Sequence, residues 1–182
     1  MANARSKSTK KRILGAAQVN AIFTRFAREM TKAYGNLDPV VFIGIRTRGP
    51  YVAKRLATLI KKRHKKDIPI GEMDITLYRD DLNALLPGGT IDHTRISFEI
   101  ANKIVVLFDD VLHTGRTVRA AVDHLIDLGR PRMIHLAVMI DRGGRELPIA
   151  ANYVGKKIDL KAGGNVEVRL KEVDRADEVW VE

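Results

Sequence analysis

The chain has 182 residues, enough for one domain with a sizeable core, and its lack of cysteine excludes disulfides, thiolate metal ligands and cysteine nucleophiles. Its 45% hydrophobic and 30% charged residues are typical of a globular protein, and its short apolar runs exclude a membrane span and a signal peptide. We therefore expect a cytoplasmic protein whose net charge of +10 needs an explanation.

The excess positive charge lies in two short segments that contain no acid. Residues 1–12 hold five Lys or Arg and residues 54–66 hold seven, whereas the rest of the chain has 20 basic and 22 acidic residues. We expect residues 1–12 to be a disordered basic tail and residues 13–182 to form a single domain. Such segments attract polyanions, but solvated charge, with Lys at a helix C-terminus, explains them equally well.

The first half of the chain alternates helical and strand patterns. Apolar residues at helical spacing predict a helix over 16–33, and the β-branched run 40–45 predicts a buried strand. A second helix follows and ends in the basic run, and a second strand is expected over 70–78. Residues 79–98 show no periodicity, and a loop of this length in a compact domain is typical of a lid or a binding loop.

The second half repeats the alternation. A buried strand over 104–108 leads into Asp109-Asp110, a helix follows up to residue 128, and a strand covers 133–140. This order predicts a largely parallel sheet with right-handed crossovers, and residues 166–170 and 179–181 predict short β structure. The five histidines show no metal-ligand spacing, so we interpret His124 and His135 as structural.

Polar residues follow three of the predicted strands, at 46–49, 109–110 and 141–145. Ligands of open α/β sheets bind beyond the carboxyl ends of the strands. The adjacent carboxylates suit ribose hydroxyls, and a helix start with Gly and two Thr at 114–117 suits a phosphate. A simpler interpretation, in which the carboxylates cap the strand and Thr117 caps the helix, does not explain both features within nine residues.

Four stretches of the sequence resemble a known enzyme family. VVLFDDVLHTGRTVRA at 105–120 resembles the phosphoribosyl-pyrophosphate (PRPP) motif of type I phosphoribosyltransferases. IGIRTRGPYVAKRLA at 43–57, GEMDITLYRDDL at 71–82 and DRGGRELPIAANYVGK at 141–156 are similar to the bifunctional pyrimidine-operon regulators with uracil phosphoribosyltransferase activity. The resemblance covers residues 13–160. It implies the α/β type I phosphoribosyltransferase fold, a mostly parallel sheet flanked by helices, with a flexible hood loop.

The resemblance also implies a reaction and a set of site residues. Uracil and PRPP would give UMP and diphosphate, with Mg²⁺ bound through substrate oxygens and no direct protein ligand. The implied catalytic residues are Asp109 and Asp110, which would hold the ribose hydroxyls, and Arg79, which would close over the substrate with the 79–98 loop. The other implied contacts are Thr47, Arg48 and Gly49 for the diphosphate, Val111, Leu112, His113, Thr114, Gly115, Arg116 and Thr117 for the 5′-phosphate, and Arg142 and Val154 near the base.

A regulatory role is implied as well. Members of this family bind the leader mRNA of pyrimidine genes in response to UMP, and the candidate RNA-binding residues here are Thr24, Arg28, Arg145 and Lys156. Ala150 stands where RNA-binding members have Arg. The resemblance further implies a homodimer or homotetramer without membrane contact. Two alternatives stay open: an RNA-binding attenuator with vestigial catalysis, and a phosphoribosyltransferase for another nucleobase.

Two positions depart from the family pattern. His113 stands where Tyr is common, and Gly144 replaces a frequent His. Because His can also pack and form hydrogen bonds in a phosphate loop, we expect the first change to have little effect on activity. The second should loosen the turn after the 133–140 strand.

Overall fold

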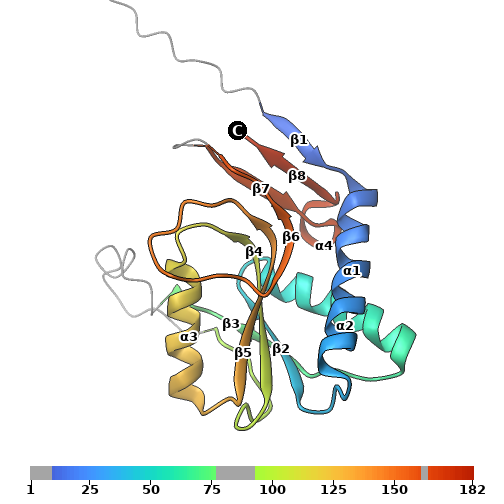
Figure 1. The fold of residues 1–182 in the computed structure, drawn as a ribbon, viewed down its shortest axis with the longest axis vertical. Coiled ribbons are helices and arrows are strands. Elements are labelled where there is room, and N and C mark those ends of the chain that lie inside the picture. The colour runs from blue at the N-terminus through green and yellow to red at the C-terminus, as the bar shows by residue number, and fades with distance from the viewer. Residues whose placement is uncertain (1–9, 77–92, 161–163) are drawn as a thin grey trace, which may run out of the picture.

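The computed structural model describes residues 10–76, 93–160 and 164–182, and its central element is a five-stranded parallel sheet (Figure 1). All four neighbouring strand pairs are parallel, which confirms the predicted sheet. In spatial order the strands are β3 (Ile70–Met73), β2 (Val40–Ile45), β4 (Ile104–Leu112), β5 (Met133–Asp141) and β6 (Tyr153–Lys157).

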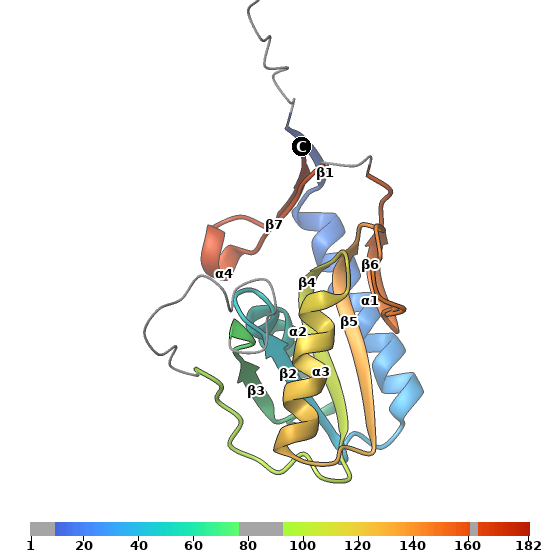
Figure 2. The same ribbon diagram turned by 90° about the vertical axis from the view of Figure 1, so that its left-hand side faces the viewer.

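Helices cover both faces of this sheet. The helices α1 (Ala16–Tyr34) and α2 (Gly49–His64) lie on one face, and α3 (Arg116–Leu128) lies on the other (Figure 2). Alternate residues of β2 point to opposite faces, so Phe42 packs in the core under α1 and α2, while Ile43 packs in the core under α3. This burial on both sides explains why β2 reads as a continuous apolar run.

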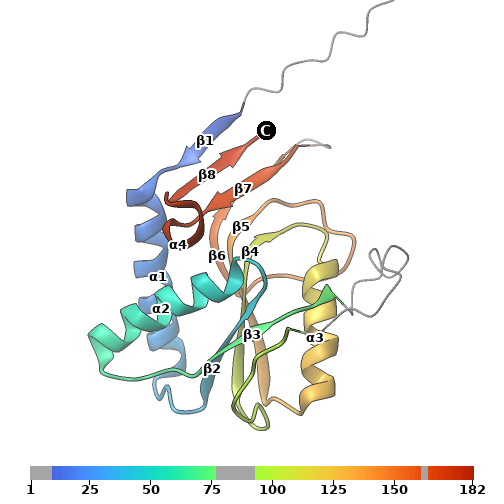
Figure 3. The same ribbon diagram turned by 180° about the vertical axis from the view of Figure 1, so that it is seen from behind.

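A second, three-stranded antiparallel sheet lies beyond the carboxyl ends of the parallel strands (Figure 3). Its order is β1 (Lys11–Leu14), β8 (Glu178–Val181) and β7 (Val166–Arg169), with the short helix α4 (Lys171–Asp174) between β7 and β8. The C-terminal β structure was predicted. The prediction that Lys11 and Arg12 belong to a disordered tail was wrong, because they pair with Val181 and Trp180 in this sheet. Residues 1–9 lie outside the described residues.

Two boundaries differ from the sequence prediction. β3 ends at Met73, and residues 77–92, which include Arg79 and most of the 79–98 loop, lie outside the described residues. β4 continues through both aspartates to Leu112, because β5 runs beside it until Leu112 pairs with Asp141. β6 and α4 were not predicted.

The two histidines that we interpreted as structural pack against other side chains of the fold. His124 is buried on α3. His135 stacks on Tyr34, whose hydroxyl lies 2.7 Å from Nδ1 of the histidine. No helix in the described part of the chain is long and apolar enough to cross a membrane.

Candidate active site

The turn between β4 and α3 encloses a cavity of about 310 Å³. Gly115 precedes α3 with a φ of 94°, a conformation that favours glycine, and the first turn of α3 contains no acidic residue. The positive end of the helix dipole therefore faces this cavity, and no acidic residue of the first turn of α3 compensates it. Thr117 lies inside α3 and does not cap it, so the simpler interpretation of this residue was wrong. The lining residues are Asp109, Val111, Leu112, His113, Thr114, Gly115, Arg116, Thr117 and Val118.

Arg145 holds this turn against the segment after β5. Its guanidinium donates to the carbonyl oxygens of His113 at 2.6 Å and Ile149 at 2.9 Å, and it forms an ion pair with Asp141 at 2.6 Å. The N–H of Glu146 donates to the carbonyl oxygen of Thr114 at 3.0 Å. Arg145 thus acts as a structural clamp for the candidate phosphate turn, a role that the sequence did not predict.

The two adjacent aspartates lie within β4. Asp109 is buried, and its Oδ1 accepts the N–H of Asp110 at 2.9 Å. Asp110 is half-buried, and its Oδ1 accepts the N–H of Val111 at 3.0 Å. One oxygen of each carboxylate is therefore held by the backbone. Because an ionised carboxylate is costly to bury without partners, this pair suits a polar ligand.

The turn from β2 into α2, at residues 46–49, packs directly against the sheet. A Cβ atom on Gly44 would lie 2.2 Å from the nitrogen of Pro50, and one on Gly49 would lie 2.2 Å from the carbonyl oxygen of Phe108. Only glycine fits at these two positions, since the neighbouring atoms belong to the backbone. The Arg46–Thr47 peptide bond in this turn is cis.

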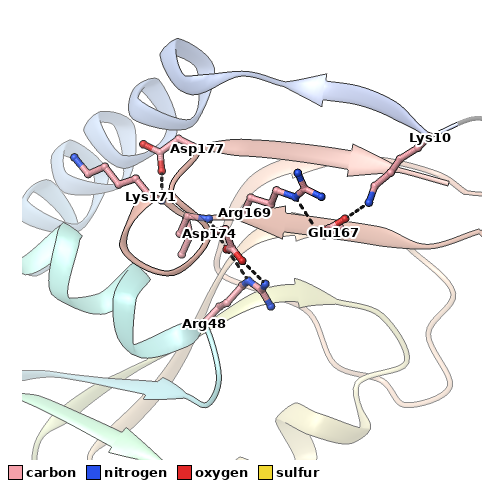
Figure 4. A network of polar contacts seen from close by, with 8 residues as sticks. Lys10, Arg48, Glu167, Arg169, Lys171, Asp174 and Asp177 are labelled. Carbon is pink, nitrogen blue, oxygen red and sulfur yellow. Dashed lines mark hydrogen bonds and ion pairs between the residues drawn. The ribbon is translucent and has the colours of Figure 1, made fainter.

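Arg48 connects this turn to the small sheet. Its guanidinium donates to both oxygens of Asp174 on α4, at 2.9 and 3.3 Å (Figure 4). The hydrogen bonds to Asp174 raise the pKa of Arg48, burial opposes this effect, and the nearby charge of Asp110 adds to it. Gly49, next to Arg48, packs against Phe108, which precedes Asp109, so the diphosphate and ribose candidates are neighbours. Asp174 is a site residue that the sequence did not reveal, because it lies 126 positions from Arg48.

His113 lies over the turn after β5. A Cβ atom on Gly144 would lie 2.9 Å from Nε2 of His113, so the two positions that depart from the family pattern are neighbours. Burial lowers the pKa of His113, and the charges of Arg142 and Arg145 lower it further.

Of the two candidates near the base, Arg142 lies at the carboxyl end of β5, whereas Val154 lies near the start of β6 and pairs with Val138 of β5. Arg142 follows β5 and donates to the carbonyl oxygen of Gly164, while its Nε is buried without a hydrogen-bond partner among the described residues. Val154 lies on β6, and its carbonyl oxygen accepts a hydrogen bond from Arg25 at 2.8 Å. The position of Arg79 lies outside the described residues.

Three of the four candidate RNA-binding residues share one exposed region. Thr24 and Arg28 are exposed on α1, and Lys156 is exposed on β6. Arg25 joins these two elements by donating to the carbonyl oxygens of Val154 and Gly155. The fourth candidate, Arg145, is turned inward by the contacts described above.

The chain has clear relatives among known proteins. It is 49% identical to the bifunctional protein PyrR of Chloroflexus aurantiacus over 171 residues, 94% of each chain. It is 45% identical to that of Thermus aquaticus over 173 residues, covering 94% of this chain and 96% of the relative. These matches extend beyond the residues 13–160 that suggested the resemblance.

Solved structures show the same fold at lower identity. A hypoxanthine phosphoribosyltransferase of Staphylococcus aureus has a TM-score of 0.70 at 23% identity and covers 93% of this chain and 90% of its own. That of Trypanosoma cruzi has a TM-score of 0.72 at 15% identity and covers 94% and 95%. Residues 11–172 match the phosphoribosyl transferase domain family. The chain therefore belongs to the phosphoribosyl transferase family and, within it, to the bifunctional PyrR proteins.

Proposed function

We propose that this chain transfers the phosphoribosyl group of PRPP to uracil, giving UMP and diphosphate. The observation that carries this proposal is the convergence of three groups at one edge of the sheet. They are the cavity at 109–118, the carboxylates of Asp109 and Asp110, and the Arg48 turn, which packs through Gly49 against the carbonyl group of Phe108. Each group matches one part of PRPP: the 5′-phosphate, the ribose hydroxyls and the diphosphate.

The proposed chemistry requires no protein nucleophile. Displacement at the anomeric carbon builds positive charge on the ribose, which the carboxylates of Asp109 and Asp110 stabilise. Arg48 and the N-terminus of α2 stabilise the negative charge that develops on the departing diphosphate. The Arg145 clamp keeps the 5′-phosphate turn in place, so that the ribose is held in a fixed orientation.

The residues present fit Mg²⁺ held mainly by the substrate. Within residues 10–76, 93–160 and 164–182, no group of three or more acids or histidines is arranged to hold a metal ion. Mg²⁺ retains several waters and binds phosphate oxygens, so it would be held through PRPP oxygens and waters while Asp109 and Asp110 take the ribose hydroxyls. Bound there, Mg²⁺ would neutralise charge on the diphosphate.

The test is a UMP-formation assay with PRPP and a panel of uracil, hypoxanthine and guanine. We expect transfer to uracil, and we expect Asp110→Asn to lower turnover by about 100-fold or more while the protein stays folded. Asp67→Asn is a matched control, because this carboxylate is exposed and lies after α2. Near-normal turnover by folded Asp110→Asn would overturn the assignment, and transfer only to a purine would assign a different base.

We further propose that the chain regulates pyrimidine genes by binding their mRNA in a UMP-dependent manner, as a homodimer or homotetramer in the cytoplasm. The exposed region formed by Thr24, Arg28 and Lys156 supports this proposal. Ala150 lacks the charge of the expected Arg, so we expect fewer contacts with RNA phosphates near this residue. Retention of a labelled leader RNA with and without UMP tests the regulatory function, and sedimentation tests the oligomeric state.

A further inference from the structure

A cleft of about 530 Å³ between the C-terminal ends of α1 and α2 is lined by basic side chains that the proposed reaction does not use. Arg28 and Lys32 of α1 and His64 and Lys66 near the end of α2 contribute to its wall. We call it the α1–α2 basic cleft. It lies far along α2 from the Arg48 turn, so its charge has no role at the PRPP site (Figure 1).

The C-terminal end of α2, beside this cleft, carries more cations than its ion pairs consume. Residues 61–66 hold five Lys or Arg, all exposed. Lys61 pairs with Asp67, and Lys66 pairs with Asp38. Lys62, Arg63 and Lys65 have no ion pair within the described part of the chain. These three cations at the end of α2 are therefore available to a negatively charged ligand.

Stabilisation of the helix end does not account for this cluster. One or two cations satisfy the negative end of a helix dipole, and further Lys and Arg at i,i+3 and i,i+4 spacing repel one another. Lys65 also follows α2 with a φ of 55°, a conformation in which Gly is favoured over a long side chain. The cluster thus has a conformational and electrostatic cost that a bound polyanion would offset.

The cleft is continuous with the candidate RNA-binding region. Thr24, Arg28 and Lys32 follow one another at i,i+4 spacing and are exposed along one side of α1. Arg28 belongs both to that region and to the cleft wall. From Thr24 to the end of α1 this side of the helix is about 15 Å long, which matches about four or five phosphates along a strand of a nucleic-acid duplex.

We propose that the α1–α2 basic cleft is a second phosphate-binding region for RNA, which extends the candidate RNA-binding region past Arg28 to the end of α2. This inference rests on the proposed RNA-binding function. The contacts are to the phosphate backbone, since the lining of the cleft supplies cations and no Phe, Tyr or Trp. They raise affinity and its salt dependence without reading the base sequence.

The experiment titrates a fluorescein-labelled RNA stem-loop with the full-length protein over a range of KCl concentrations. The variant Lys32→Gln/Lys66→Gln removes two cations that line the cleft. We expect the slope of log K against log salt to fall by about 1 to 2, and the affinity at low salt to fall about tenfold or more. UMP formation should stay unchanged, which also shows that the variant is folded.

The matched control is Arg130→Gln/Arg132→Gln, which removes the same charge from exposed positions on the turn between α3 and β5, away from the cleft (Figure 1). The control should leave the salt slope unchanged. Equal slopes for both variants and the wild type would overturn the proposed region while leaving the RNA-binding function intact. No binding by the wild type would overturn the RNA-binding function and, with it, this inference.

Discussion

Gly49→Ala tests whether the candidate diphosphate turn is held by direct backbone contact. The added methyl group would lie 2.2 Å from the carbonyl oxygen of Phe108 and 3.1 Å from the carbonyl carbon of Gly44. Ordinary contact between such atoms needs about 3.5 Å, so the turn would have to move by more than about 1 Å. Both neighbours are backbone atoms of buried strands, and neither can rotate away.

The expected cost is at the upper end of the range for overpacking, about 3 kcal/mol. A protein of this size has an m-value of about 2–3 kcal/mol/M in urea, so the unfolding midpoint should fall by about 1 M. Since the fold is stable by about 5–15 kcal/mol, the variant should remain folded without denaturant. A displacement of about 1 Å at the diphosphate turn should also lower kcat/KM for PRPP by about 100-fold.

Urea denaturation followed by circular dichroism measures the first effect, and initial rates of UMP formation measure the second. Gly15→Ala is the control, because the nearest atom to its Cβ would be 3.9 Å away and its φ is −109°. We expect the control to change stability by less than about 1 kcal/mol. A midpoint for Gly49→Ala equal to that of the control would refute the close approach of this turn to β4.

Three other changes test single contacts. Arg145→Ala should raise KM for PRPP about tenfold, because the phosphate turn loses its clamp, and unchanged kinetics would argue against that role. Asp174→Asn should destabilise the fold by about 1–2 kcal/mol at pH 7, as measured by urea denaturation. Burial opposes ionisation of Asp174, but hydrogen bonds from Arg48 and the Leu170 N–H hold its pKa below the ordinary value. In the wild type, the stability that comes from the Arg48–Asp174 contact should therefore be present above about pH 4 and disappear at lower pH. The unfolding free energy of the variant should not show this decrease. Lys65→Gly should raise the unfolding free energy by up to about 1 kcal/mol, because it relieves the positive φ, while it weakens RNA binding. A stability decrease for Lys65→Gly would contradict this account.

The parallel sheet and its helices followed from local patterns. The apolar run of β2 and the helical spacing in α1 reflect burial against neighbours that the same segments meet in the fold. The candidate phosphate turn was also predictable, because its carboxylates, glycine and threonines lie within nine consecutive residues. A site built from one continuous segment leaves its signal in the sequence.

Contacts between distant segments were not predictable in this way. Strand β1 exists only because β8 lies beside it, so Lys11 and Arg12 looked like part of a charged tail. Arg145 looked like an exposed cation, yet its donors meet carbonyl oxygens that the chain brings together only after folding. The net charge likewise has one aspect that the sequence determines and one that depends on the fold. The sequence by itself determined the residue types of the candidate PRPP site and the number of excess cations. Only the tertiary structure placed the end of the second basic segment, with Lys66, beside Arg28, because the ends of α1 and α2 meet only when both helices pack on one face of the sheet.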